Sequence, residues 1–226
     1  MFFFPSEIFY DGILTQEKIK LKLFKEYITN PALVIECSLD LKNLNELSLY
    51  NQALTSIDPT AFDGFTRLRI LNLSWNKLTV IPPEAFKDLK ALLLLSLSGN
   101  PLTIVNPETF VELNRLEVLR MSYNQLTIID AKLFSKLTNL KELWLSYNQI
   151  SEIDPNTFVG LSKLSELRLT SNQITNIEQK TFNGLNNLKI LDLRFNRLDI
   201  VNPNTFSGLN NLQDCYFVRK SCTPIP

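Results

Sequence analysis

The sequence has no histidine and only three cysteines and six glycines among its 226 residues. Without histidine, the Ser-His-Asp and Cys-His nucleophile pairs and most catalytic zinc sites are excluded. None of the glycines lies in a GxGxxG or GxxxxGK pattern, so no phosphate-binding loop is visible. The cysteines show no CxxC spacing and are too few for a dense disulfide framework. An enzyme is therefore the least favoured class, and no metal or cofactor is expected.

The sequence also lacks an excess of either charge. It has 23 basic and 23 acidic residues, a formal net charge of zero. A dedicated nucleic-acid-binding protein normally has a basic excess, so we expect no nucleic-acid partner. No apolar run approaches the ~20 residues that a membrane span needs. The first ten residues lack the basic and apolar regions of a signal peptide, and the cellular compartment stays open.

A repeat occupies most of the chain. Leucine recurs every 24 residues, at Leu44, Leu68, Leu92, Leu116, Leu140, Leu164, Leu188 and Leu212. The six leucines from Leu68 to Leu188 begin the pattern LxxLxLxxNxL, with other apolar residues at some leucine positions, whereas the asparagine position holds Gln52 in the first register and Lys220 in the last. A phenylalanine recurs further along, at Phe62, Phe86, Phe110, Phe134, Phe158, Phe182 and Phe206. The LxL alternation is typical of a strand with one buried face. One 24-residue coil cannot bury its own leucines, so neighbouring coils must stack.

This pattern resembles the leucine-rich repeat family, in the 24-residue form found in Toll-like receptors and variable lymphocyte receptors. The resemblance covers roughly residues 41 to 222. It implies an α/β solenoid, a horseshoe arc with a parallel concave β-sheet and an irregular convex side. We expect about eight repeats over residues 41–226 and at least eight strands in the sheet. The repeat class is common in extracellular proteins, although the cysteine-rich caps of secreted members are missing here.

An asparagine column follows the strands, at Asn76, Asn100, Asn124, Asn148, Asn172 and Asn196. An asparagine side chain offers a carbonyl and an amide together, so each can bridge backbone groups of its own coil and the next coil. The phenylalanines are expected to stack along the convex side. Both columns occupy core positions, so a structural role is favoured over ligand binding.

Residues 1–40 do not carry the repeat and are expected to form an N-terminal capping segment with one helix, from Thr15 to Asn30. A different interpretation rests on Phe4 to Ile8 followed by Ile13 and Leu14, which resembles the start of an F-box. It leaves open an F-box-like ubiquitin-ligase substrate receptor as an alternative function.

At the other end, nothing after Lys220 looks long enough to cover the last coil. An open end would expose unpaired strand edges, so we expect a weak homodimer through the C-terminal end, near Tyr216 and Phe217. Cys215 and Cys222 occupy leucine positions of this coil. They are interpreted as small buried apolar residues, with a disulfide between them as the alternative.

Recognition is expected at the outward positions of the strands and of the turns that follow them. Arg120, Trp144 and Arg168 are predicted to stand on three adjacent strands, and Trp and Arg are enriched at binding hot spots. Glu142 and Glu166 can pair with the arginines. The full predicted partner-binding set is Arg120, Tyr123, Glu142, Trp144, Tyr147, Glu166, Arg168, Asp192 and Phe195. The competing interpretation is a solvated face on which arginine stacks on tryptophan for local stability.

The sequence thus favours a non-enzymatic protein-protein recognition module that binds a protein partner on the concave face. A receptor domain for a glycan or lipid ligand is a second alternative beside the F-box hypothesis.

Overall fold

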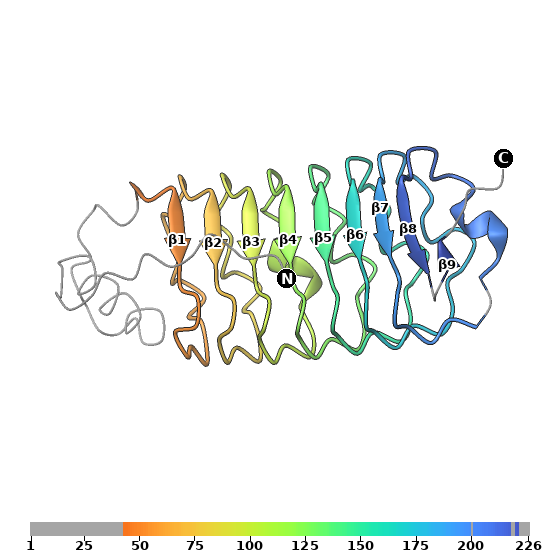
Figure 1. Ribbon diagram of the computed structural model, residues 1–226. Helices are drawn as coiled ribbons and strands as arrows, with labels where there is room; N and C mark the ends of the chain where they lie inside the picture. Colours follow the sequence, from red (N-terminus) through yellow and green to blue (C-terminus); the bar gives the residue numbers. More distant parts are fainter. Residues whose placement is uncertain (1–42, 200, 218–219, 222–226) are drawn as a thin grey trace, which may run out of the picture.

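The computed structural model describes residues 43–199, 201–217 and 220–221. Its nine strands lie in chain order in one sheet (Figure 1). They are β1 (Glu46–Ser48), β2 (Ile70–Asn72), β3 (Leu94–Ser96), β4 (Val118–Arg120), β5 (Glu142–Trp144), β6 (Glu166–Arg168), β7 (Ile190–Asp192), β8 (Asp214–Phe217) and β9 (Lys220–Ser221). Strands β1 to β8 are all parallel, which confirms the predicted sheet of at least eight parallel strands.

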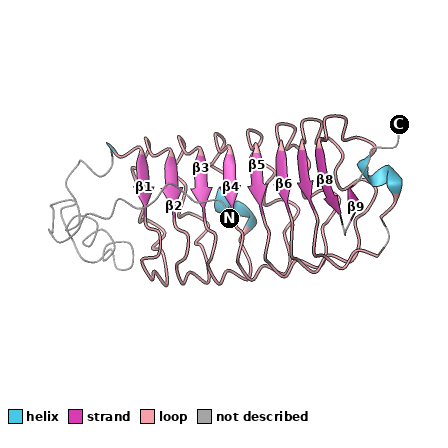
Figure 2. Cartoon of the chain, viewed as in Figure 1, coloured by secondary structure: helices cyan, strands magenta, loops and turns pink. Residues whose placement is uncertain are grey.

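The register of the sheet follows the 24-residue step of the sequence. Leu119 of β4 pairs with Leu143 of β5, which pairs with Leu167 of β6. The second residue of each parallel strand is buried, while the residues on either side of it point outward in most strands. Turns and two 3-10 helices, η2 (Pro107–Phe110) and η3 (Pro203–Phe206), make up the rest of the coils (Figure 2). None of the described residues is α-helical, so this part of the chain is a β-solenoid.

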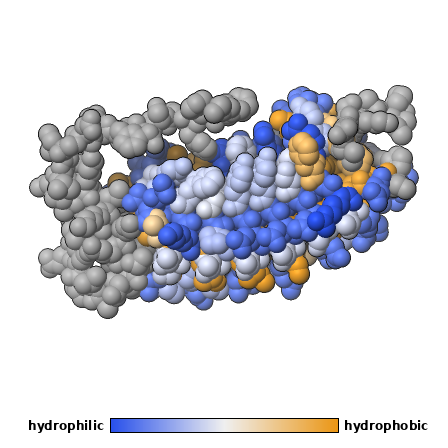
Figure 3. Space-filling model, turned by 60° about the horizontal axis from the view of Figure 1, so that its bottom comes forward, coloured by the Kyte–Doolittle hydropathy of each residue, from blue (hydrophilic) through white to orange (hydrophobic). Residues whose placement is uncertain are grey.

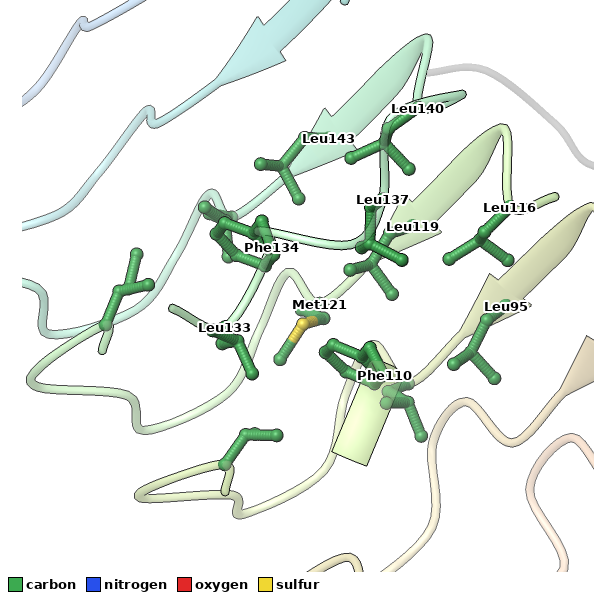
Figure 4. Close-up of a cluster of buried hydrophobic side chains, with 14 of the residues drawn as sticks. Leu95, Phe110, Leu116, Leu119, Met121, Leu133, Phe134, Leu137, Leu140 and Leu143 are labelled. Atoms are coloured by element: carbon green, nitrogen blue, oxygen red, sulfur yellow. The ribbon is translucent and has the colours of Figure 1, made fainter. Parts of the chain in front are cut away.

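The core runs along the inside of the solenoid as one continuous apolar cluster. In the close-up, Leu119 and Leu143 of adjacent strands point toward Phe110 and Phe134 of the opposite wall (Figure 4). Phe86 and Phe110 stack with their rings 6.5 Å apart and nearly parallel, as the predicted phenylalanine column requires. The leucine and phenylalanine columns therefore fill each coil from its two sides.

The asparagine column connects neighbouring coils, but in the opposite direction from the one expected. Asn148 Nδ2 donates to the Leu145 carbonyl in its own coil and to the Met121 carbonyl in the preceding coil. Its Oδ1 accepts from the Leu126 N–H, also in the preceding coil. The prediction of a bridge to the next coil was wrong, because the turn directs the amide back toward the preceding coil. The predicted burial is confirmed for Asn148 and Asn124.

The C-terminal end differs from the open end that the sequence suggested. Strand β9 pairs antiparallel with β8, with Tyr216 opposite Ser221 and Phe217 opposite Lys220. This pairing covers two residues of the β8 edge and makes β9 the last strand of the sheet. The expected homodimer stays a prediction. Cys215 is buried and disulfide-bonded, and its partner lies outside the described residues.

The predicted N-terminal capping helix and the F-box-like segment fall within residues 1–42, outside the part of the chain that the structure describes.

Candidate functional site

Three residues predicted to mediate binding stand side by side on β4, β5 and β6. Arg120 pairs in register with Trp144, and Trp144 pairs with Arg168. Parallel strands in register present equivalent positions on one face at the strand spacing of about 4.8 Å. The sheet therefore brings these three side chains together as the repeat predicts.

The indole of Trp144 lies between the two guanidinium groups. Arg120 Cζ is 4.2 Å from the centre of the Trp144 ring, and Arg168 Cζ is 5.0 Å from it. Each such contact contributes about 0.5–1 kcal/mol when exposed and more when desolvated. Trp144 Nε1 is buried and has no hydrogen-bond partner among the described residues. The indole is thus held by its ring contacts with the two arginines.

A carboxylate accompanies each of these arginines. Arg120 Nη2 and Glu142 Oε2 are 3.7 Å apart, and Arg168 Nε donates to Glu166 Oε1. The ion pairs confirm the predicted partnership between the glutamates and the arginines. The positive charge around the indole is balanced, so this part of the face is close to neutral.

A second row of aromatic residues lies in the turns after the strands, just before each asparagine. The rings of Tyr123 and Tyr147 stack 4.4 Å apart with planes only 6° from parallel. The Trp75 ring lies 5.8 Å from that of Tyr123. All three side chains are nearly half exposed, and burial together with the neighbouring Tyr147 raises the pKa of Tyr123. Exposed and contiguous aromatic side chains commonly mark a contact surface.

Figure 3 views the side of the array onto which these turns open. Side chains of intermediate hydropathy form a pale row there, bordered by hydrophilic residues. A shallow groove of about 380 Å³ follows the row and is lined by Trp75, Gly99, Pro101, Tyr123, Gln125 and Tyr147 among others. The row therefore has beside it a shallow recess of mixed polar and apolar lining that a ligand can contact.

Two further predicted residues, Asp192 and Phe195, have contrasting environments. Asp192 is only 4% exposed, and its carboxylate accepts hydrogen bonds from Arg194 Nε at 2.9 Å and Nη2 at 2.6 Å. Burial alone would raise the pKa of Asp192, but the hydrogen bonds from Arg194 and Thr170 lower it on balance. Phe195 is 74% exposed, the highest value among the large apolar residues of the described part.

Arg194 is the surface member of this pair and was not singled out from the sequence. Its guanidinium lies over the ring of Tyr216 at 4.6 Å while it holds Asp192. The spacing of Asp192 and Arg194, two residues apart across the end of β7, was the available signal. Side chains two residues apart along a strand lie on the same face, so this spacing indicates a pair.

Within the described residues, no group of three or more His, Cys, Asp or Glu side chains is arranged to hold a metal ion. The same part of the chain contains no helix long and apolar enough to cross a membrane.

The coils also match a family model. The family described as leucine rich repeat matches four overlapping segments, residues 35–78, 66–126, 116–174 and 162–214. The chain belongs to the leucine-rich repeat family. A comparison with curated proteins gives no match.

Solved leucine-rich repeat structures resemble this one. A leucine-rich repeat protein of Leptospira interrogans is 33% identical, with a TM-score of 0.69 over 76% of this chain and 42% of its own. Toll, in the Drosophila Toll–Spätzle complex, is 31% identical, with a TM-score of 0.65 over 68% of this chain and 22% of its own. TLR13, in a complex with ssRNA13, is 27% identical, with a TM-score of 0.54 over 77% of this chain and 33% of its own. This leucine-rich repeat chain thus spans less than half the length of each.

The repeats of this family member are of the Toll type, as the sequence predicted. Leucine-rich repeat solenoids commonly serve as interaction modules and are typically not enzymes. The family and the fold support that general class for this protein.

Proposed function

We propose that this leucine-rich repeat protein recognises a protein partner on its concave face, centred on Arg120, Trp144 and Arg168. The observation that carries the proposal is the Trp144 ring held between two arginines on adjacent strands. Tryptophan and arginine are the residues most enriched at binding hot spots, and the ion pairs hold both arginines in place. A neutral, preorganised group of this kind loses little side-chain entropy when a partner binds.

The exposed aromatic row extends this surface. Trp75, Tyr123 and Tyr147 lie in the turns that directly follow the strands β2, β4 and β5. Seven steps between eight parallel strands, at about 4.8 Å each, give a face roughly 34 Å long. That length fits a standard protein interface of about 800 Å² per partner.

The glycan alternative receives less support from the geometry. A sugar ring binds best to an open aromatic face, whereas the stack covers one face each of Tyr123 and Tyr147 and Trp75 also contacts Tyr123. Trp144 has an arginine over its ring on each neighbouring strand. Side chains of a protein can instead contact the exposed ring edges and the paired charges around them.

Comparative capture experiments test the proposal. The wild-type chain and a Trp144→Ala, Arg168→Ala double variant are immobilised and exposed to an extract of the source cells, and the retained proteins are quantified by mass spectrometry. The matched control is Val159→Ala, Lys180→Ala, which truncates two exposed residues away from the strands. We expect at least one protein retained by wild type and control but lost from the double variant.

The folded state of the variants is checked by circular dichroism, because Trp144→Ala also removes two ring contacts. We expect it to lower the free energy of unfolding by roughly 1–2 kcal/mol, the sum of two such contacts. A set of captured proteins that is the same for the folded double variant as for the wild type would refute recognition through this centre.

A further inference from the structure

The aromatic row belongs to a longer column of seven residues that share one backbone conformation. All have positive φ values between 52° and 70°, in the left-handed region, and they are Asn51, Trp75, Gly99, Tyr123, Tyr147, Ser171 and Phe195. Equal backbone angles at equal coil positions direct the side chains alike. The column therefore has one equivalent side-chain position in each coil, and four of these positions hold an aromatic residue.

One position of the column between two aromatic residues is a glycine, and a neighbouring ring already fills the space above it. Gly99 lies between Trp75 and Tyr123 in the column, and the Trp75 ring leans over it. A Cβ atom on Gly99 would lie only 2.6 Å from Trp75 Cδ2. As a result, Trp75 contacts Tyr123 two coils away, with ring centres 5.8 Å apart. The chain itself shows that a gap of one residue in this column accepts an aromatic ring.

A second small residue, the partly buried Ser171, interrupts the row of rings and leaves a gap in it between Tyr147 and Phe195. Here no neighbouring ring leans over the small residue: Phe195 is 74% exposed, and none of the ring contacts found among the described residues involves it. Two coil steps separate Tyr147 from Phe195 along the sheet, about 9.6 Å at the usual strand spacing. A ring placed midway would lie about 4.8 Å from each, within the range of stacked aromatic pairs.

The floor of this gap is fixed by the backbone. The Ser171 N–H donates to the Arg194 carbonyl at 2.9 Å, and the Tyr147 N–H donates to the Thr170 carbonyl at 2.8 Å. These bonds connect each coil to the next, so the coils cannot approach one another to close the gap.

We propose that the gap over Ser171 is a slot that receives one aromatic side chain of a protein partner, between Tyr147 and Phe195. The proposal rests on the proposed recognition of a protein, and it names the chemistry of one contact. An uncharged aromatic ring suits the space because it can stack on a ring at either side. Arg194, the residue before Phe195, is already engaged with Asp192 and Tyr216. Arg168 and Arg194 are both paired with carboxylates, so the surface offers little charge for the phosphates of a nucleic acid.

Two peptides with the sequences Gly-Glu-Trp-Glu-Gly and Gly-Glu-Leu-Glu-Gly, both acetylated and amidated, test the slot. Binding is followed by NMR of the aromatic side chains as each peptide is titrated into the full chain. We expect the tryptophan peptide to shift the ring signals of Tyr147 and Phe195 and to bind at least tenfold more tightly than the leucine peptide. Equal binding of the two peptides, or no shift of these signals, would overturn the proposal.

Ser171→Tyr fills the slot with the chain's own ring, and tyrosine already occupies this backbone conformation at Tyr123 and Tyr147. We expect it to abolish tryptophan-peptide binding. Asn51→Tyr is the matched control, because it introduces the same residue in the same backbone conformation at the far end of the column, and it should bind as the wild type does. If Ser171→Tyr does not fold, Phe195→Ala removes one wall and should weaken binding at least fivefold. Undiminished binding by the folded variant tested overturns the slot.

Two further arms separate the possible failures. A single-stranded RNA of eight uridines that shifts the same ring signals when the tryptophan peptide does not would assign the slot to nucleic acid and overturn the proposal. The Trp144→Ala, Arg168→Ala variant should retain peptide binding, because the slot lies outside that centre. Failure of the proposed function then appears as unchanged partner capture, and failure of the slot appears in the peptide titration.

Discussion

The side-chain amide of Asn148 donates a hydrogen bond to the carbonyl of Met121, 27 residues earlier, at 3.0 Å. The same amide contacts the Leu145 carbonyl of its own coil, and its oxygen accepts from the Leu126 N–H. One side chain thus satisfies backbone groups of two successive coils in a buried turn, where water cannot replace it.

Replacing Asn148 by alanine should therefore lower the free energy of unfolding by at least about 2 kcal/mol, because a buried group left unpaired costs about 1–3 kcal/mol. Chemical denaturation measures the change. Gln149→Ala, one residue along and exposed, is the control and should change stability by less than ~0.5 kcal/mol. Equal midpoints for the two variants would show that the asparagine ladder is not what holds the coils together.

Unlike the hydrogen-bonded asparagines, a column of buried threonines has side-chain hydroxyls without a partner among the described residues. The hydroxyls of Thr109, Thr157, Thr181 and Thr205 are buried without a hydrogen-bond partner among the described residues. Alanine or leucine occupies the same coil position at Ala61, Ala85 and Leu133. A buried, unpaired hydroxyl costs about 1–3 kcal/mol relative to an apolar group of the same shape. We expect Thr157→Val to leave the thermal midpoint unchanged or to raise it, and a clear fall would reveal a hydrogen bond in solution.

The pairing of Asp192 with Arg194 predicts a pH dependence of stability. Arg194 and Thr170 lower the pKa of Asp192 below its ordinary value of 3.8. The folded state therefore favours the carboxylate, and this stabilisation is complete above pH 3.8 and is lost as the pH falls through the lower pKa of the folded state.

Comparison of wild type with Asp192→Asn by urea denaturation from pH 7 to pH 2 checks this. We expect the wild type to be more stable at pH 7 and the difference to shrink below pH 3.8. A difference that stays constant over the whole range would mean that the carboxylate charge contributes nothing.

The disulfide of Cys215 predicts a chemical cross-link at the C-terminal end. In the β8–β9 ladder, Tyr216 pairs with Ser221, and the adjacent residues in the sequence are Cys215 and Cys222. We expect Cys222 to be the partner. Mass spectrometry of peptides from the unreduced protein should detect a Cys215–Cys222 cross-link that reduction removes. A cross-link to Cys37 would assign the disulfide to the other end of the chain.

The sequence was sufficient to predict the position of each repeating residue. The 24-residue step places each leucine, asparagine and phenylalanine at the same point of every coil, so one coil predicts the next. It also predicted the neighbours Arg120, Trp144 and Arg168, because parallel strands in register align equal repeat positions. Stacking identical coils is the only way to bury such a pattern, and this is why composition and spacing determine the solenoid.

The tertiary structure decided the side-chain contacts at positions that break the repeat. It also decided which of several neighbours a side chain contacts. Trp75 leans over Gly99 because that position alone in its surroundings has no side chain. Asp192 is buried while Arg194 covers it, and β9 turns back onto β8 instead of continuing the parallel order. The asparagines bond to the preceding coil and not to the next one. These features depend on distances between particular side chains in different coils, which a period along the chain does not contain.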